Sequence, residues 1–484
     1  MSFPSFWSPV DLATLRGKER EVAEHVAGLF AEIDGIGHAE SNSDAGYHRL
    51  SWSSEEAWLR VWFAAHMQRR GFTVHVDTAG NQWAWMGDPT TEHPGVTIGS
   101  HLDSVPGGGA FDGPLGVISA IAAFDVLRSS GWEAPCPFAI VNFHDEEGGR
   151  FAVACFGSRT LTGLLMPGRA LAMKDKQGIS YRQALERFPE LLEDVRRRAP
   201  HSETLGDFTP RQIALAVEAS AAPSPETLKG DVDYMRLSAA HVELHIEQGR
   251  AQCGMGAPVA VADKIWPHGR WRLEIDGMPN HAGCTPMDQR HDPMRSFVKL
   301  VDAVNVEAEK RGARVTIGKI ICCPNGVNVI PGRITCWLDC RAQDESQVNG
   351  VVDAIAERIA HGEFDTGAHS GADDAPDVRI LNESWTESTV FSASVRNALL
   401  EALSVRHEGS EVPVIGTAAG HDAGILAETG SPAGMLFVRN MTGASHTPAE
   451  FATLSDSALG VLAYAKVLKE FSESVSRGWR PSNE

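Results

Sequence analysis

The apolar residues of this chain form two kinds of pattern along the sequence. Short continuous runs, each ending in a polar segment, occur at 95–99, 137–143, 241–246 and 433–438. Runs of this length predict buried strands. Stripes with helical spacing occur at 114–129, where Pro114 stands near the start, and at 455–471. Because the predicted strands and helices alternate, we expect an α/β fold with a mixed, mostly parallel sheet.

The region around the first of these strands carries patterns of its own. Leu12–Ala31 has a helix-like stripe, and Ser53-Ser54-Glu55-Glu56 matches a capping box that opens an amphipathic helix. Two short strands at 73–76 and 82–86, separated by a polar turn, predict a hairpin. Residues 161–240 are polar and mostly helical in pattern.

The middle of the chain shows a different order of elements. Its members are a strand (270–275), a helix (293–311), two strands (314–322 and 333–340), a helix (345–360) and a strand (377–382). This β-α-β-β-α-β order is typical of a ferredoxin-like α+β unit. The α/β pattern then returns with a helix at 391–405 and a strand at 411–415. We therefore predict one α/β domain in two parts, 1–265 and 386–484, with a ferredoxin-like domain, 266–385, inserted between them.

Composition and charge narrow the range of partners. The 484 residues carry a formal net charge of -20, which argues against nucleic acid or an anionic membrane as the main partner. The N-terminus lacks a basic region followed by an apolar core, and no window approaches the ~18–20 apolar residues of a membrane span, so we expect neither a signal peptide nor a membrane segment. The eight cysteines form no Cys-x-x-Cys pair, and we expect buried, reduced thiols in a cytoplasmic protein.

Histidines and carboxylates gather where the predicted strands end. The set comprises His101, Asp112, Glu147, His245 and His446. Imidazoles with carboxylates and without thiolates suit Zn, Mn, Co or Ni in a catalytic site, and the wide spacing argues against a structural zinc site. Ligand sets of this kind leave an open position at which a bound water ionises near neutral pH.

Residues next to this set have candidate roles as well. Because the adjacent Glu146 and Glu147 cannot easily point the same way, one can bind metal while the other acts as a general base. Asp103, two residues after His101, can accept the other imidazole N–H and orient the ring. Each residue taken alone also has a plainer interpretation, as part of an ordinary loop (Glu146 and Glu147), a core histidine (His245), a loop cap (His446) or a turn residue (Asp103 and Asp112).

Six segments resemble, in the same order, the metal-site motifs of the M20 metallopeptidase family. They are Gly-Ser-His-Leu-Asp-Ser (99–104), Phe-Asp-Gly-Pro-Leu-Gly (111–116), Asp-Glu-Glu-Gly (145–148), Glu-Leu-His-Ile-Glu-Gln-Gly (243–249), Asn-His-Ala-Gly (280–283) and Ser-His-Thr-Pro-Ala-Glu (445–450). The His-Ile-Glu-Gln-Gly form resembles the amidohydrolase branch, which contains N-carbamoyl-L-amino acid hydrolases, allantoate amidohydrolases and β-ureidopropionases. The resemblance extends from about residue 96 to residue 450.

The resemblance implies a site for two divalent metal ions. One ion would be held by His101, Asp112 and His245, and the other by Asp112, Glu147 and His446, with Asp112 bridging. Glu146 would be the base that takes a proton from the bridging water. In this family the peptide bond after the bridging aspartate is cis, which would make Asp112–Gly113 a strained non-proline cis bond.

The resemblance also assigns roles to the inserted domain, which would be the lid and dimerisation domain of a homodimer. His281 would reach the site of the neighbouring subunit and stabilise the oxyanion. Gln248, Asn328 and Arg341 match positions that contact substrate, and Arg341 suits a bidentate clamp on a carboxylate. The plainer alternatives are a surface ion pair for Arg341 and a loop histidine stacked on Pro279 for His281.

The chain is therefore expected to be a metal-dependent amidohydrolase that cleaves the C–N bond of a ureido or N-carbamoyl compound, such as allantoate or an N-carbamoyl-L-amino acid. An aminoacylase or dipeptidase of the same family, acting on N-acyl amino acids or peptides, is the alternative. A hypothesis of another class is a metal-binding protein without catalysis that serves as a binding or scaffold module. The presence of Glu146 and of every ligand in the sequence argues against it.

Overall fold

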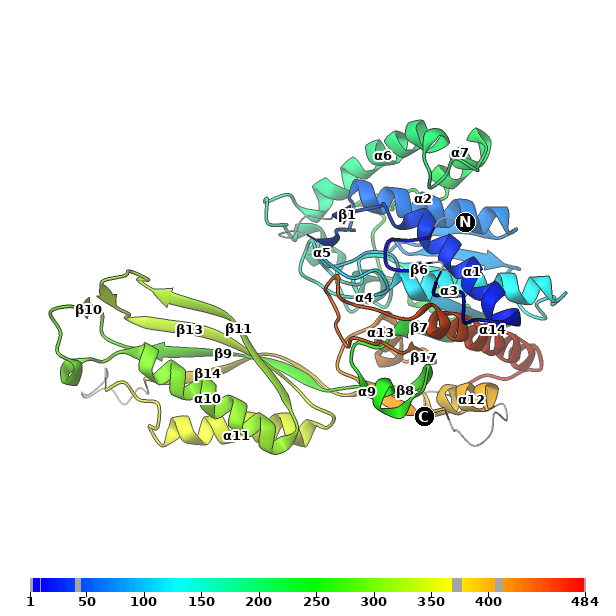
Figure 1. Ribbon diagram of the computed structural model, residues 1–484. Coiled ribbons are helices and arrows are strands. Elements are labelled where there is room, and N and C mark those ends of the chain that lie inside the picture. The colour runs from blue at the N-terminus through cyan, green and yellow to red at the C-terminus, as the bar shows by residue number, and fades with distance from the viewer. Residues whose placement is uncertain (1–2, 9, 40–44, 368–376, 405–411, 483–484) are drawn as a thin grey trace. The chain divides into compact units, whose positions relative to one another are not determined.

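The chain divides into two compact units, drawn in Figure 1. The structure is a computed structural model, and it describes residues 3–8, 10–39, 45–367, 377–404 and 412–482. The first unit comprises Met1–Asp263 and Val390–Glu484, and the second comprises Lys264–Thr389. The second unit is therefore one continuous insert in the sequence of the first.

A mixed sheet forms the centre of the first unit. In spatial order its main path is β15 (Thr389–Val390), β8 (Val259–Ile265), β17 (Ala433–Val438), β7 (Ser238–Ile246), β5 (Gly95–His101), β6 (Phe138–Phe143), β4 (Gln82–Met86) and β3 (Thr73–Val76), and β16 (Val414–Thr417) pairs with β8. Strands β17, β7, β5 and β6 run parallel, whereas β8 pairs antiparallel with β17, β4 with β6 and β3 with β4. The carboxyl ends of the four parallel strands therefore point to the same end of the sheet, which is where α/β sheets bind their ligands.

Helices with an apolar stripe pack on this sheet and complete the core. α1 (Gly17–Ile33), α3 (Pro114–Ser129) and α14 (Leu454–Ser476) pack together, and α3 and α14 lie on β5 and β7. α2 (Ser54–Arg69) packs on β3 and β4 and against α6 (Tyr181–Arg198) and α7 (Pro210–Glu218). The unit also contains α4 (Phe156–Leu161), α5 (Pro167–Ala172), α8 (Val232–Met235), α9 (Ala251–Met255), α12 (Ala393–Leu403), α13 (Asp422–Glu428), a 3₁₀ turn (Ala199–His201) and a strand pair, β1 (His38–Ala39) and β2 (Gly46–Tyr47).

Helices make up about half of the polar segment 161–240, less than its mostly helical pattern predicts. Its longest helix, α6, buries Tyr181, Phe188 and Leu192 in the same core that contains the apolar residues of α2. The segment is therefore an integral layer of the first unit.

The start of α2 shows how burial overrides a local motif. Ser53 accepts the N–H of Glu56 at 3.2 Å, so the expected cap is present. The reciprocal half of the capping box is wrong, because the Glu56 carboxylate accepts the N–H of Trp52 instead. Glu56 is buried, and its other oxygen pairs with His144 Nδ1 at 2.6 Å, which ties the start of α2 to the loop that follows β6.

Most predicted elements are confirmed with small shifts of their ends. The helix expected from Leu12 begins at Gly17, because the residues before it form turns. The sequence did not predict β8, whose apolar run is interrupted by Asp263 and Lys264, nor α13, a short helix of seven residues. Residues 405 and 411, at the ends of a predicted helix and strand, lie outside the described residues.

The second unit is an antiparallel sheet with two helices packed on it. Its strands lie in the order β11 (Arg314–Cys323), β13 (Arg333–Arg341), β9 (His268–Asp276) and β14 (Val378–Thr386). α10 (Pro293–Arg311) and α11 (Glu345–Ala360) share a core with this sheet that includes Leu273, Leu300 and Leu338. A smaller pair, β10 (Asn280–His281) and β12 (Val329–Ile330), and a 3₁₀ turn (Met287–Gln289) complete the unit. The chain order β-α-β-β-α-β agrees with the predicted order.

Two further expectations concern thiols and membranes. All eight cysteines are free. Cys155, Cys336 and Cys340 are buried, but Cys284 and Cys323 are exposed, so the expectation of buried thiols is wrong for these two. Among the described residues, every helix is too short or too polar to span a bilayer.

Candidate metal centre

The parallel strands of the first unit bring the predicted ligands of that unit together. His101 is the last residue of β5, and His245 is the second-last residue of β7. Glu146 and Glu147 follow β6, and His446 lies in the loop after β17. Because β17, β7, β5 and β6 are neighbours in that order, residues far apart in the sequence meet at the carboxyl ends of these strands.

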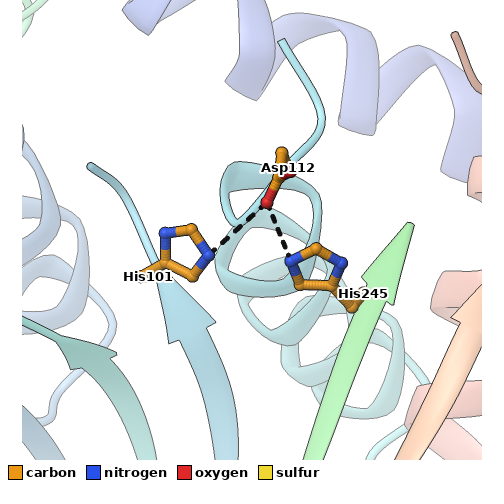
Figure 2. Close-up of side chains that lie close together, drawn as sticks. All are labelled: His101, Asp112 and His245. Atoms are coloured by element: carbon orange, nitrogen blue, oxygen red, sulfur yellow. Dashed lines mark ion pairs between the residues drawn. The ribbon is translucent and has the colours of Figure 1, made fainter. Parts of the chain in front are cut away.

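Asp112 lies between two imidazole rings (Figure 2). Its Oδ1 is 3.1 Å from His245 Nε2 and 3.7 Å from His101 Nε2. All three side chains are buried, and one ligand atom from each lies within 4.8 Å of the others. This spacing fits two imidazoles and one carboxylate around a single cation.

The other oxygen of the same carboxylate faces a second set of ligands. Asp112 Oδ2 is 3.6 Å from His446 Nε2, which is 3.2 Å from Glu147 Oε2. This set is more open than the first, because the His446 side chain is 50% exposed. His101 Nε2 and Glu147 Oε1 are buried without a hydrogen-bond partner, which a bound ion would explain. The residues present therefore fit two divalent ions that share Asp112.

Backbone and side-chain hydrogen bonds set the orientation of the ligands. His245 Nδ1 lies 2.8 Å from the carbonyl of Ile246, which leaves Nε2 to face Asp112. His101 Nδ1 lies 3.2 Å from the Asp103 carbonyl and 3.3 Å from its carboxylate. The Asp103 carboxylate also accepts the N–H groups of Glu146 (3.1 Å) and Glu147 (3.0 Å). One buried aspartate thus connects the ends of β5 and β6, as supporting residues of metal sites do.

The electrostatics of the site favour cations. Burial raises the pKa of the Glu146 carboxyl well above its ordinary range, although His101 opposes the shift. Burial also acts to raise the pKa of Asp112, but His245 and His101 outweigh it and lower that pKa. The hydrogen bond to Glu147 raises the pKa of His446 to about 9. Protonated histidines therefore compensate the carboxylates here, and divalent ions would do so more strongly.

Gln248, which follows β7, is held against the bridging carboxylate. Its Nε2 donates to Asp112 Oδ2 at 2.8 Å and to Ser445 Oγ at 2.9 Å. Its Oε1 is buried and has no hydrogen-bond partner. The site thus presents one unsatisfied amide oxygen beside Asp112.

Glu450 is a buried residue of the site whose role the sequence did not indicate. Its Oε1 accepts the N–H groups of Phe111 (3.0 Å) and Asp112 (2.8 Å) and so fixes the backbone of the bridging residue. The available signal was its place at the end of the segment Ser445–Glu450.

His421 and Glu243 are further buried residues that the sequence did not single out. The ring of His421 lies 4.5 Å from that of His245, and neither of its nitrogens has a hydrogen-bond partner. With His245 they form a third group of possible ligands. Both Glu243 oxygens already accept hydrogen bonds, from Ser100 Oγ (2.8 Å) and Ala423 N–H (2.9 Å), so this group is the weaker candidate.

The expected cis bond between Asp112 and Gly113 is wrong. This bond is trans, and among the described residues the one cis bond joins Cys323 to Pro324. The chain turns into α3 through the positive φ of Gly113, +85°. A Cβ at Gly113 would lie 2.3 Å from the His101 ring, so only glycine fits here.

The second unit holds the other three predicted residues, each near a strand end. His281 pairs with Val329 between β10 and β12, and the Asn328 carbonyl accepts the N–H of Ala282 at 2.9 Å, so His281 and Asn328 lie on adjoining segments. His281 is exposed, and its Nδ1 accepts the N–H groups of residues 283 and 284, both at 3.1 Å. The neutral ring therefore carries its proton on Nε2.

Arg341, at the end of β13, is already engaged in an ion pair. Its Nε lies 2.7 Å and its Nη2 3.1 Å from the two oxygens of Asp339. The guanidinium is thus presented in the bidentate geometry that carboxylates accept. Arg341 thus forms an ion pair of the kind that the plainer alternative describes, and its contact with substrate stays a prediction.

The fold and the site together define a class, an α/β protein with a histidine–carboxylate metal centre at the carboxyl ends of its parallel strands. A sequence profile of Peptidase family M20/M25/M40 matches residues 97–470, and the chain belongs to this family.

Similar proteins share almost the whole length of the chain. It is 32% identical over 442 residues to an N-carbamoyl-L-amino acid amidohydrolase of Geobacillus stearothermophilus, covering 89% of this chain and 95% of that protein. It is 30% identical over 428 residues to the allantoate amidohydrolase of Escherichia coli strain K12, with 87% and 92% covered. A crystal structure of a hydantoinase/carbamoylase family amidase from Burkholderia ambifaria superimposes with a TM-score of 0.71 at 26% identity, covering 92% of this chain and 96% of that one.

Proposed function

We propose that the protein is a metal-dependent amidohydrolase that cleaves the C–N bond of a ureido or N-carbamoyl substrate, either allantoate or an N-carbamoyl-L-amino acid. The observation that carries the proposal is the position of Asp112, whose two oxygens face two separate sets of ligands. The relatives named above act on such compounds according to their names, and they match nearly the full chain. The resulting centre would hold two divalent ions, of Zn, Mn, Co or Ni.

The ligands and the base divide the work in this proposal. His101 and His245 with Asp112, and His446 and Glu147 with Asp112, are the two ligand sets. Ions bound there would polarise the substrate carbonyl and lower the pKa of a water. Glu146, whose Oε2 is 3.8 Å from His101 Nε2, takes a proton from the attacking water and passes it to the leaving nitrogen.

The second unit serves as a ferredoxin-like lid and dimerisation domain. Its edge strand β11 exposes Ile320 (49%) and Ile321 (51%), and the neighbouring helix α10 exposes Val298 (61%). A cavity of about 270 Å³ between these elements is lined mostly by apolar side chains. An apolar edge of this kind suits pairing with the same edge of a second copy. In the homodimer, His281 donates from Nε2 to the oxyanion at the site of its partner.

Two of the proposed substrate-contacting residues belong to the second unit and one to the first. Arg341 holds the substrate carboxylate in place of Asp339, and Asn328 lies beside His281 to contact the same substrate. In the first unit, the unsatisfied Oε1 of Gln248 accepts an N–H of the ureido group. In an N-acyl amino acid or a dipeptide a carbon atom takes the place of the terminal ureido nitrogen, so this oxygen favours the ureido class over the aminoacylase or dipeptidase alternative.

The reducing environment of the cytoplasm suits this protein, because all eight cysteines are free and two of them are exposed.

Ammonia release across a substrate panel tests the proposed function. The metal-loaded protein is incubated with allantoate, N-carbamoyl-L-amino acids and N-carbamoyl-β-alanine, and with N-acetyl amino acids and dipeptides for which amino-acid release is followed. We expect turnover of one ureido compound. Turnover of the acyl compounds or dipeptides alone would assign the aminoacylase or dipeptidase alternative, and metal binding without any turnover would favour a binding module.

A further inference from the structure

Cys155 lies directly beside the proposed base and belongs to none of the metal-site motifs. It is the N-cap residue of α4, its side chain is buried, and its Sγ is 3.2 Å from Glu146 Oε1. The other oxygen, Oε2, is 3.8 Å from His101 Nε2. The thiol and the metal centre therefore lie on opposite oxygens of one carboxylate.

The backbone holds this thiol in place. Three consecutive N–H groups, of Cys155 (2.5 Å), Phe156 (3.0 Å) and Gly157 (2.9 Å), donate to the consecutive carbonyls of residues 146, 145 and 144. Cys155 also has a left-handed backbone, with φ +53°, which turns the chain into α4. The start of α4 and the loop of the base are thus fastened together, so the distance from Sγ to the carboxylate is set by the backbone.

We infer that Cys155 is a positioning residue, whose S–H donates to Glu146 Oε1 and so keeps Oε2 turned toward the metal centre. The inference rests on the proposed role of Glu146 as the base. Burial raises the pKa of the Cys155 thiol well above its ordinary value, so the group keeps its proton and acts as a donor. A thiol is a weak donor, but Glu146 must be an ionised carboxylate to act as the base, and a carboxylate acceptor strengthens the bond.

Substitution of Cys155 separates this role from simple packing. In Cys155→Ala the donor is lost, and we expect kcat to fall about tenfold, the effect of losing one hydrogen bond to a charged group. KM, metal content and melting temperature should change little. Cys155→Ser keeps a hydrogen-bond donor, and serine must adopt the same left-handed backbone as alanine. The serine variant should therefore retain most of the wild-type kcat. Cys136→Ala is the matched control, because Cys136 Sγ donates to the Pro137 carbonyl (3.3 Å) at the other end of β6.

Two kinetic outcomes would overturn the inference. The first is a kcat of Cys155→Ala within twofold of the wild type. The second is an equal loss in the Ser and Ala variants together with a lower melting temperature, which is the signature of packing.

An infrared measurement tests the same contact without turnover. The S–H stretching band that Cys155→Ala removes from the spectrum of the metal-loaded protein is assigned to Cys155. In Glu146→Gln this band should move to higher wavenumber, because an amide oxygen is a weaker acceptor than a carboxylate. An unmoved band would overturn the inference. If the wild type turned over no substrate of the panel, the proposed function would fail, while the infrared comparison would still decide the contact between Cys155 and Glu146.

Discussion

The two units hold their candidate residues in opposite ways. In the first unit, the residues of the metal centre come from several strand ends and loops, most are buried, and hydrogen bonds connect them across long stretches of sequence. In the second unit, His281 is exposed and Arg341 is partly exposed, and each is held by a bond within a few residues of its own position. The first unit therefore determines its own geometry, whereas the proposed targets of His281 and Arg341, an oxyanion and a substrate carboxylate, are not residues of the second unit.

This difference teaches where substitutions should act. Changes in the first unit should alter the chemistry or the metal content inside one chain. Changes in the second unit should leave the metal content alone and depend on the partner chain. The predictions below test this division, starting with the largest effect.

Loss of the base should have the largest effect. Glu146→Gln keeps the size of the side chain and removes the proton acceptor, so turnover should fall about 10²- to 10⁴-fold. The metal content, measured by mass spectrometry of the metals, should stay at the wild-type level, because Glu146 is not a proposed ligand. Survival of turnover would contradict the mechanism, and loss of metal would make Glu146 a ligand.

Loss of the oxyanion donor should follow, and it should be repaired in trans. His281→Ala should lower kcat by about 10²- to 10³-fold with unchanged metal content. After subunit exchange with Glu146→Ala, about half of the dimers are mixed and one of their two sites is complete, so about a quarter of the wild-type activity should return. The exposed His361, at the end of α11, provides a control in His361→Ala, which should behave as wild type.

Absence of recovery under conditions that exchange subunits would contradict a site shared between chains. The exposure of His281 would then not reflect a role at the site of a partner chain.

Loss of the buried connector should weaken metal binding. Asp103→Asn leaves the N–H groups of Glu146 and Glu147 with a poorer acceptor and loosens His101, so the metal affinity should fall about 10- to 100-fold. Competition with a chelator measures the affinity. Asp88→Asn, at an exposed loop position, is the matched control, and an equal loss in both variants would contradict the role of Asp103.

The smallest effect should be a pH dependence of metal affinity at the more open set of proposed ligands, which contains His446. His446 must lose its proton to bind an ion, and its pKa in the metal-free protein is raised to about 9 by Glu147. As the pH falls below that value, the neutral fraction and the affinity of this set should fall about tenfold per pH unit, and above it they should level off. Calorimetric titration with a metal ion, which also reports proton release, measures this. A flat affinity between about pH 7 and pH 9 would contradict the pKa of His446.

Much of the fold could be predicted from the sequence, because its elements have clear periods. The apolar runs of β5, β6 and β17 and the stripes of α3 and α10 indicate both type and position. β8 escaped prediction because Asp263 and Lys264 break its apolar run, and α13 because a helix of seven residues has too few turns for a stripe.

The types of residue in the centre could also be predicted, but the contacts could not. Histidines and carboxylates at the ends of the predicted strands indicate a metal site, and the family resemblance assigns each of them to one of two ions. The hydrogen bond from Cys155 to Glu146 depends on a left-handed backbone at residue 155, and a cysteine in the sequence does not predict that conformation. The contact between the rings of His421 and His245 depends on the spatial order of the strands, which could not be predicted from the sequence.

The position of the insert has a consequence for synthesis on the ribosome. β17 pairs in parallel with β7, yet the whole of Lys264–Thr389 separates the two strands in the chain. The insert is therefore complete, with its own core, before β17 exists. Until residues 433–438 emerge, β7 is an open edge of an unfinished sheet, and His446, the last proposed ligand, arrives later still. The nascent chain must keep this edge from aggregating throughout that interval.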